Sequence, residues 1–95
     1  MSKIRESARG EQCVRCGAAD GTVVLAHYTG VRQHSYGKGT ATKGNDLIGA
    51  HLCHRCHEEF DQPSTRKSVE ASEEFLHCVA LTIIRLSMKE VINVR

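Results

Sequence analysis

Apolar residues follow three patterns along the chain, and each predicts an element. The run at residues 22–28 is β-branched and apolar, which is typical of a strand, and residues 47–52 form a second, shorter run of this kind. From Val69 to about Met88 apolar residues recur every three or four positions, as in an amphipathic helix about 30 Å long. Ser68 precedes this pattern and is a suitable N-cap for the helix.

The remaining segments are short or rich in glycine. Residues 2–9 and 54–62 predict short helices, and Pro63 is expected to end the second of them. Residues 29–46 contain four glycines and three basic residues with almost no apolar anchor. This composition indicates a loop, and a loop of such length in a small domain is usually functional or disordered. Residues 91–94 favour a short terminal strand.

Four cysteines in two Cys-x-x-Cys pairs are the most informative feature of the chain. Cys13 and Cys16 recur as Cys53 and Cys56, and His57 follows the second pair directly. Two knuckles with two thiolates each supply the four ligands that tetrahedral Zn²⁺ requires. The histidine is one ligand more than a closed structural site uses, so it suggests a second metal ion with a chemical role.

A disulfide framework is the alternative to zinc, and the sequence argues against it. Residues 1–6 have no apolar run that could act as a signal peptide. Disulfide pairing would also leave the fifth cysteine, Cys78, without a partner. We therefore expect a zinc-binding, cytoplasmic protein. No apolar stretch approaches the roughly eighteen residues that a membrane span needs, since Arg85 interrupts the best candidate.

Length and charge refine this picture. A chain of 95 residues with two Phe, two Tyr and no Trp is expected to form one domain, residues 1–95, in which a metal reinforces a small core. We expect a metal-finger core at about 10–62 and a C-terminal helix at about 68–90. Residues 1–57 carry eight Lys and Arg against four Asp and Glu, whereas residues 58–95 carry five against seven. The metal-binding half is the basic half, which is compatible with a nucleic-acid partner.

The order of strand, long loop, strand, knuckle and short helix resembles the ββα-metal finger of HNH endonucleases. The matching sequences are CVRC, LAHY, GNDLIGAHLCHRCH and the EEFD that follows. Within that superfamily the chain is most similar to the small prophage-encoded YbcO type, over about residues 5–65. These proteins share an Ala-His strand ending, a DLI(G/A)A stretch and a Cys-His-x-x-x-Asp helix. The resemblance implies a metal-dependent nuclease that hydrolyses phosphodiester bonds in DNA.

The resemblance also implies roles for individual residues. His27 matches the strand histidine that acts as general base, a role that suits imidazole because it can accept a proton at neutral pH. His57 matches the metal-binding histidine of the closing motif. Asp61 lies one helical turn later, so it would share a face with His57 and help to hold Mg²⁺ or another divalent cation. Each role has an ordinary alternative. His27 could be a histidine that bonds to nearby backbone, His57 an unbound imidazole beside the zinc knuckle, and Asp61 a surface carboxylate without a metal.

Two positions depart from the HNH pattern. Many HNH enzymes carry a metal-binding Asp or His directly before the general base, and this chain has Ala26 there. The Asn that usually orients the base has no strict counterpart, because Asn45 and Asp46 stand earlier than expected. We assign the orienting role to Asp46, which directly precedes the second strand. Either departure could weaken or abolish activity.

The glycine-rich loop supplies candidate contacts to nucleic acid. Arg32, Lys38 and Lys43 could bind phosphates, and Tyr36 could stack on an unpaired base. An ordinary solvated loop is the alternative. His51 is expected to be solvated, and no role is assigned to the histidines outside the HNH pattern, which are His34, His51, His54 and His77.

The sequence thus predicts an α+β protein, a zinc-stabilised ββα-metal (treble-clef-like HNH) finger with a long C-terminal helix. Its predicted function is that of a phage- or prophage-derived endonuclease acting on DNA. The first alternative is a zinc module that binds nucleic acid or protein without catalysis, which would need none of His27, His57 and Asp61. The second is a structural subunit that forms homo-oligomers through the C-terminal helix, since apolar residues cover more than half of its circumference.

Overall fold

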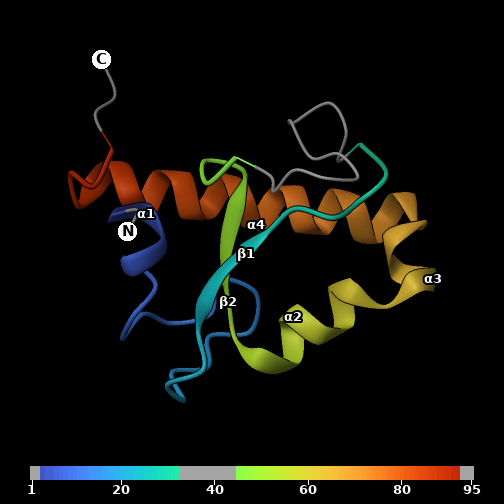
Figure 1. Ribbon diagram of the computed structural model, residues 1–95, viewed down its shortest axis with the longest axis horizontal. Coiled ribbons are helices and arrows are strands. Elements are labelled where there is room, and N and C mark those ends of the chain that lie inside the picture. The colour runs from blue at the N-terminus through green and yellow to red at the C-terminus, as the bar shows by residue number, and fades with distance from the viewer. Residues whose placement is uncertain (1–2, 33–44, 93–95) are drawn as a thin grey trace.

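The structure is a computed structural model that describes residues 3–32 and 45–92 (Figure 1). Within these ranges it contains a two-stranded sheet and a long C-terminal helix, so the α+β prediction is confirmed. The assignment of a single domain to residues 1–95 stays a prediction. The elements in chain order are α1 (Lys3–Glu6), β1 (Val24–His27), β2 (Gly49–Leu52), α2 (His54–Asp61), α3 (Pro63–Arg66) and α4 (Val69–Met88).

The two strands pair antiparallel, with Val24 opposite Leu52 and His27 opposite Gly49. Side chains alternate between the faces of a strand, so Leu25, His27 and Gly49 point to the same side of the sheet. A Cβ atom at Gly49 would lie 2.8 Å from Cγ of Leu25. Glycine is therefore required at the start of β2, because the Leu25 side chain fills the space beside it.

β1 begins at Val24 rather than at residue 22 as the apolar run predicts. The reason is a turn in which the Asp20 carboxylate accepts hydrogen bonds from both the backbone N–H and the hydroxyl of Thr22. The same hydroxyl oxygen accepts a 3.0 Å bond from the backbone N–H of His54 at the start of α2. Thr22 thus links the entry to β1 with the segment that leaves β2.

α4 is the largest element and lies across both strands (Figure 1). Its predicted N-cap is confirmed, because the Ser68 side chain accepts a 3.2 Å hydrogen bond from the backbone N–H of Ala71. Phe75 then stacks on Phe60 of α2, with ring centroids 4.5 Å apart, and meets Tyr28 edge-on at 5.3 Å. These three aromatic rings join α2, α4 and the end of β1 into one core.

Small residues on one face of the sheet make room for the aromatic core to pack against it. Ala26 and Ala50 are opposite each other and fully buried, and Leu52 lies beyond them on the same face. Ala26 and Tyr28 are two positions apart, so both point to the face that packs against Phe75. The side chain of the adjacent His27 consequently points to the opposite face.

The short helices differ from the prediction at their ends. Pro63 ends α2 as expected, but it also begins α3, because proline at the first helical position has no N–H to leave unpaired. The predicted helix at residues 2–9 spans only Lys3–Glu6 within the described residues. The hydroxyl of Ser7 donates to the carbonyl of Ile4 and closes its last turn.

The two faces of α4 have different environments. Its inner face is buried, whereas Leu81, Ile84 and Met88 on the outer face are exposed. Self-association through this helix stays a prediction. The predicted terminal strand is wrong for residues 91 and 92, which bend back so that both backbone N–H groups approach the carbonyl of Leu86; residues 93 and 94 lie outside the described range. Over the described residues, none of the helices combines the length and apolar character that crossing a membrane requires.

Candidate functional site

The four paired cysteines converge on one point. The Sγ atoms of Cys13, Cys16, Cys53 and Cys56 all lie within 4.8 Å of one another, and those of Cys16 and Cys53 are 3.6 Å apart. Tetrahedral zinc with Zn–S bonds of about 2.3 Å would place its sulfur ligands about 3.8 Å apart. The cluster therefore has the spacing and the donor chemistry of a structural zinc site.

Local backbone geometry builds each half of this cluster. In the first knuckle the N–H of Gly17 donates to the carbonyl of Cys13 at 2.8 Å, and Gly17 has a φ of +81° that favours glycine. In the second knuckle Cys53 is the last residue before α2, and its carbonyl accepts the N–H of His57 at 2.9 Å. Cys56 lies within the first turn of α2. Both knuckles thus present two sulfurs from one tight turn.

The thiols of the cluster cannot all ionise by themselves. Burial opposes ionisation of Cys13, but hydrogen bonds from the backbone N–H groups of Cys53, Cys16 and Arg15 outweigh it and lower its pKa to about 7. Burial, together with hydrogen bonds to the neighbouring cysteines, raises the pKa of Cys56 to about 12 even though Arg15 lowers it. A divalent cation would favour the thiolate form of all four, so metal binding should release protons.

Arg15 connects the first knuckle to two helices. Its guanidinium forms an ion pair with Glu74 of α4, with Nε and Oε2 3.1 Å apart, and a second ion pair with Glu59 of α2. It also lies over the ring of Phe60, 4.7 Å from the centroid. The knuckle is therefore joined to the aromatic core through a half-buried cation, a contact that the cysteine spacing did not reveal.

His51 is completely buried, so the expectation that it would be solvated is wrong. Its Nε2 lies 3.1 Å from the hydroxyl of Ser7, and a guanidinium nitrogen of Arg85 lies 3.0 Å from its Nδ1. Arg85 can only donate, so Nδ1 accepts and Nε2 carries the proton that is donated to Ser7. Burial and the Arg85 charge lower the pKa of His51 to about 4, which keeps the ring neutral.

His27 ends β1 and contacts a carboxylate. Its Nε2 lies 2.8 Å from Oδ1 of Asp46, and the two side chains are 20 % and 23 % exposed. Asp46 is presented by a turn in which Asn45 is the anchor: the Asn45 side chain accepts the N–H of Leu47 and its carbonyl accepts the N–H of Ile48, both at 2.9 Å. The structure thus brings Asp46, rather than Asn45, to the imidazole.

The second oxygen of Asp46 has a partner of its own. Nε of Arg5 lies 3.3 Å from Oδ2 of Asp46, so one carboxylate bridges α1 and the end of β1. Arg5 was not singled out by any sequence pattern, because it stands forty-one positions from Asp46.

His57 and Asp61 form a second histidine–carboxylate pair on α2. Nε2 of His57 lies 3.5 Å from Oδ2 of Asp61, and the side chains are 36 % and 41 % exposed. Arg66 lies 3.3 Å from the other oxygen of Asp61. Within residues 3–32 and 45–92, the four cysteines are the only group of three or more side chains arranged to hold a metal ion. The pair on α2 therefore brings one ring nitrogen and one carboxylate together but is not part of a larger cluster of this kind among the described residues.

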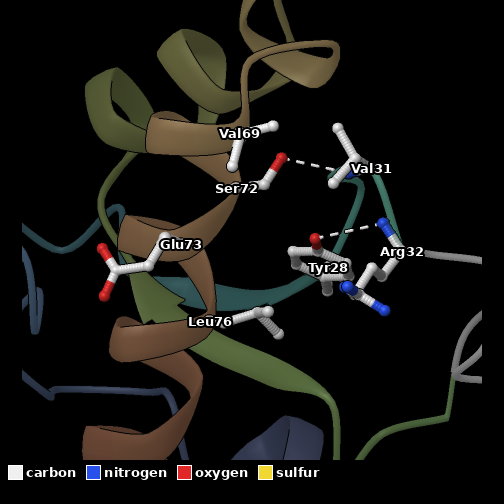
Figure 2. Close-up of a pocket in the computed structure, with 7 residues that line it drawn as sticks. All are labelled: Tyr28, Val31, Arg32, Val69, Ser72, Glu73 and Leu76. Carbon is white, nitrogen blue, oxygen red and sulfur yellow. Dashed lines mark hydrogen bonds between the residues drawn. The ribbon is translucent and has the colours of Figure 1, made fainter.

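The predicted nucleic-acid contacts lie mostly beyond the described part of the chain, which excludes Tyr36, Lys38 and Lys43. Arg32 is described and follows the turn after β1, where its N–H donates to the hydroxyl oxygen of Tyr28 at 3.4 Å. Figure 2 shows this turn beside α4, around an open groove of about 220 Å³. The groove has a largely apolar lining, formed by Tyr28, Val31, Arg32, Val69, Ser72, Glu73 and Leu76.

Comparison with known proteins identifies the family. The model of a family described as "putative nuclease YbcO" matches residues 2–90. The chain belongs to the YbcO family. A solved structure described as a putative bacteriophage protein from Escherichia coli K-12 is 31% identical, covers 93% of this chain and all of its own, and superposes with a TM-score of 0.61. Among curated proteins, none is similar enough to count as a match.

The YbcO match extends beyond the metal finger into α4, over more of the chain than the motifs in the sequence cover. This is consistent with the contacts of α4, since Arg85 and Thr82 bond to His51 on β2 and Phe75 packs on α2. In this YbcO-family chain the long helix is thus part of the structure that holds the candidate site.

Proposed function

We propose that this YbcO-family protein is a phage- or prophage-derived, metal-dependent endonuclease of the HNH type that hydrolyses phosphodiester bonds in DNA. The observation that carries the proposal is the 2.8 Å contact between His27 and Asp46 at the end of β1. An imidazole held by a carboxylate has the arrangement of an oriented general base. The family description as a nuclease and the zinc-type cysteine cluster support the same conclusion.

The contact with Asp46 determines how His27 would act. An ionised carboxylate can only accept, so Nε2 carries a proton and donates it to Oδ1 of Asp46. Nδ1 is then the basic nitrogen of the ring. It would take a proton from the water that attacks the scissile phosphate, while Asp46 holds the ring in place and stabilises the imidazolium that forms.

His57 and Asp61 would hold the divalent cation that HNH chemistry requires. The Asp61 carboxylate on an exposed helix face suits Mg²⁺, which usually keeps several waters and binds through one or two carboxylates. The His57 imidazole is a ligand that transition-metal cations prefer, so the pair is compatible with another divalent cation as well. When bound, such an ion would supply positive charge to the phosphate and the leaving oxygen. Ala26 contributes nothing there, since it is fully buried in the core.

The substrate surface in this proposal is the basic loop after β1. Arg32, Lys38 and Lys43 would contact phosphates and thereby position the strand, and Tyr36 would stack on a base that is not paired. Arg32 is exposed at the point where the described part of this loop ends, one turn beyond His27.

The decisive experiment compares DNA cleavage by the wild type and His27→Ala over a series of divalent metals. We expect wild-type activity with Mg²⁺ or Mn²⁺, and a loss of about 10²–10⁴-fold in His27→Ala with zinc content and DNA binding preserved. His54→Ala is the matched control, because His54 is an exposed histidine on α2 that pairs only with Glu58 among the described residues. Plasmid, single-stranded and branched DNA should all be assayed. Equal cleavage by wild type and His27→Ala would refute the mechanism.

A non-catalytic zinc module is the second candidate. The observation that favours it is the lack of a second group of three metal ligands among the described residues. This candidate predicts zinc-dependent binding of nucleic acid or protein with no cleavage of any of the three DNA substrates, whatever divalent metal is added.

A further inference from the structure

Arg5 contacts the carboxylate that faces the proposed base. Its Nε contacts Oδ2 of Asp46 at 3.3 Å, while Oδ1 of the same carboxylate contacts Nε2 of His27 at 2.8 Å. The three groups form a chain in which both oxygens of the carboxylate accept a hydrogen bond, Oδ1 from His27 and Oδ2 from Arg5. A carboxylate fixed at both oxygens has less freedom to rotate than one held at a single oxygen, so the Arg5 contact restricts the orientation of the Asp46 group that faces His27.

The segment that carries Arg5 is anchored to the core. α1 contacts β1, and the hydroxyl of Ser7, two positions after Arg5, accepts the Nε2 proton of the buried His51. The same hydroxyl donates to the carbonyl of Ile4. Since His51 is on β2 and lies on the same face as His27, the sheet itself sets the position of Arg5 relative to the proposed base.

The charges around His27 have opposite signs. Asp46 approaches His27 from the turn before β2 with a negative charge, and Arg5 approaches Asp46 from α1 with a positive charge that partly offsets it. His51, the titratable group on the neighbouring strand, contributes no charge while it is neutral. Removal of the Arg5 charge would therefore leave the Asp46 carboxylate beside His27 less compensated.

We propose that Arg5 is a positioning residue for His27, acting through Asp46. The inference rests on the proposed nuclease function and adds to it the residue that sets both the orientation of the Asp46 carboxylate and the net charge beside His27. Arg5 is assigned no contact with substrate or metal.

Two measurements on Arg5→Gln test this proposal. The first is an NMR titration of the His27 ring, whose signal is identified by its absence in His27→Gln. Without Arg5 the Asp46 charge is less compensated, so the midpoint should rise by about half to one pH unit. The second is the pH profile of kcat/KM for DNA cleavage. The midpoint of its acid limb should move to higher pH by the same amount. Arg5→Lys should restore most of the wild-type profile, because lysine can still pair with the carboxylate.

Arg9→Gln is the matched control, since Arg9 is exposed, follows the same short helix and removes the same charge. It should leave both midpoints unchanged. If Arg5→Gln gives the wild-type His27 midpoint, the positioning role is wrong. The titration needs no substrate and therefore separates the two proposals. If the His27 midpoint shifts in a protein that cuts no DNA, the positioning role of Arg5 is supported and the nuclease function is rejected. If the protein cuts DNA and the midpoint does not shift, only the positioning role is rejected.

Discussion

Two histidines on the same face of the sheet have opposite chemical environments. His27 is partly exposed and contacts a carboxylate, which suits an imidazole that gains and loses a proton. His51 is completely buried and its Nδ1 accepts a hydrogen bond from a cation, which suits an imidazole that stays neutral. The difference arises from single partners, Asp46 in one case and Arg85 in the other. At the level of the residue, the partner decides which histidine suits the proposed role of general base.

The neutral state of His51 makes stability depend on pH. Its pKa is about 4 in the folded protein against an ordinary value of 6.5, so below pH 6.5 the unfolded chain binds a proton that the folded chain does not. The stability that neutral His51 contributes is fully present above pH 6.5 and is lost as the pH falls towards 4. The free energy of unfolding should fall by about 2–3 kcal/mol in total over this range.

We expect His51→Gln to be less stable than wild type at pH 7 and to lose less stability between pH 6.5 and pH 4.5. Denaturant unfolding of both proteins in excess zinc measures this, and the zinc-dependent part cancels in the comparison. Parallel stability curves for the two proteins over this pH range would contradict the assignment of the titration to His51.

At the level of the element, α4 is held by a few contacts rather than by its whole surface. Phe75 is 1 % exposed and contacts rings from both α2 and the end of β1. Thr82 accepts the N–H of His51 at 3.0 Å and donates to the carbonyl of Cys78 at 2.9 Å, so it ties the edge of β2 to the helix. The outer residues of the helix, such as Leu81, add little burial in the monomer.

Phe75→Ala should therefore destabilise the fold by about 3–5 kcal/mol, because it removes a buried ring and leaves a cavity between α2, α4 and β1. Leu81→Ala changes the same helix at a position that is 36% exposed and should cost much less. Thermal or denaturant unfolding measures both. Similar losses in the two variants would mean that the outer face of α4 is covered in solution, as the homo-oligomer prediction requires.

At the scale of the whole molecule, the cysteine cluster joins segments that the small core alone holds weakly. The first knuckle comes from the loop between α1 and β1, and the second comes from the junction of β2 and α2. The N-terminal segment also lies beside the C-terminal end of α4 (Figure 1). Ion pairs of Glu11 with Arg85 and Lys89 join the two segments. Such surface pairs contribute little each, so the metal is expected to supply most of the cohesion of this half.

Removal of the metal should accordingly unfold the N-terminal half. Cys53→Ala should lose bound zinc and most of the hydrogen-exchange protection of the sheet. Cys78→Ala should keep its zinc, because Cys78 is buried in α4 and its pKa is raised to about 11 by burial, as expected for a thiol that packs in a core. Metal analysis and hydrogen exchange on both variants and on chelator-treated protein provide the test. Loss of zinc in Cys78→Ala, or a folded sheet in Cys53→Ala, would contradict this account.

The sequence by itself determined the features that depend on neighbouring positions. The Cys-x-x-Cys spacing predicted the metal cluster, the periodicity from Val69 to Met88 predicted α4, and Ser68 predicted its beginning, because ligand spacing, helical period and capping are local properties. The pairing of His57 with Asp61 one turn later follows for the same reason.

Only the tertiary structure decided which distant residues meet. The contact of Arg5 with Asp46 spans forty-one positions, and the burial of His51 depends on Ser7 from α1 and Arg85 from α4. No spacing rule encodes these pairs, since they follow from the way α1 and α4 pack on the two strands. The sequence therefore predicted which types of residue form the candidate site. Tertiary packing decided the protonation state of His51 and the connection of His27 to Arg5 through Asp46.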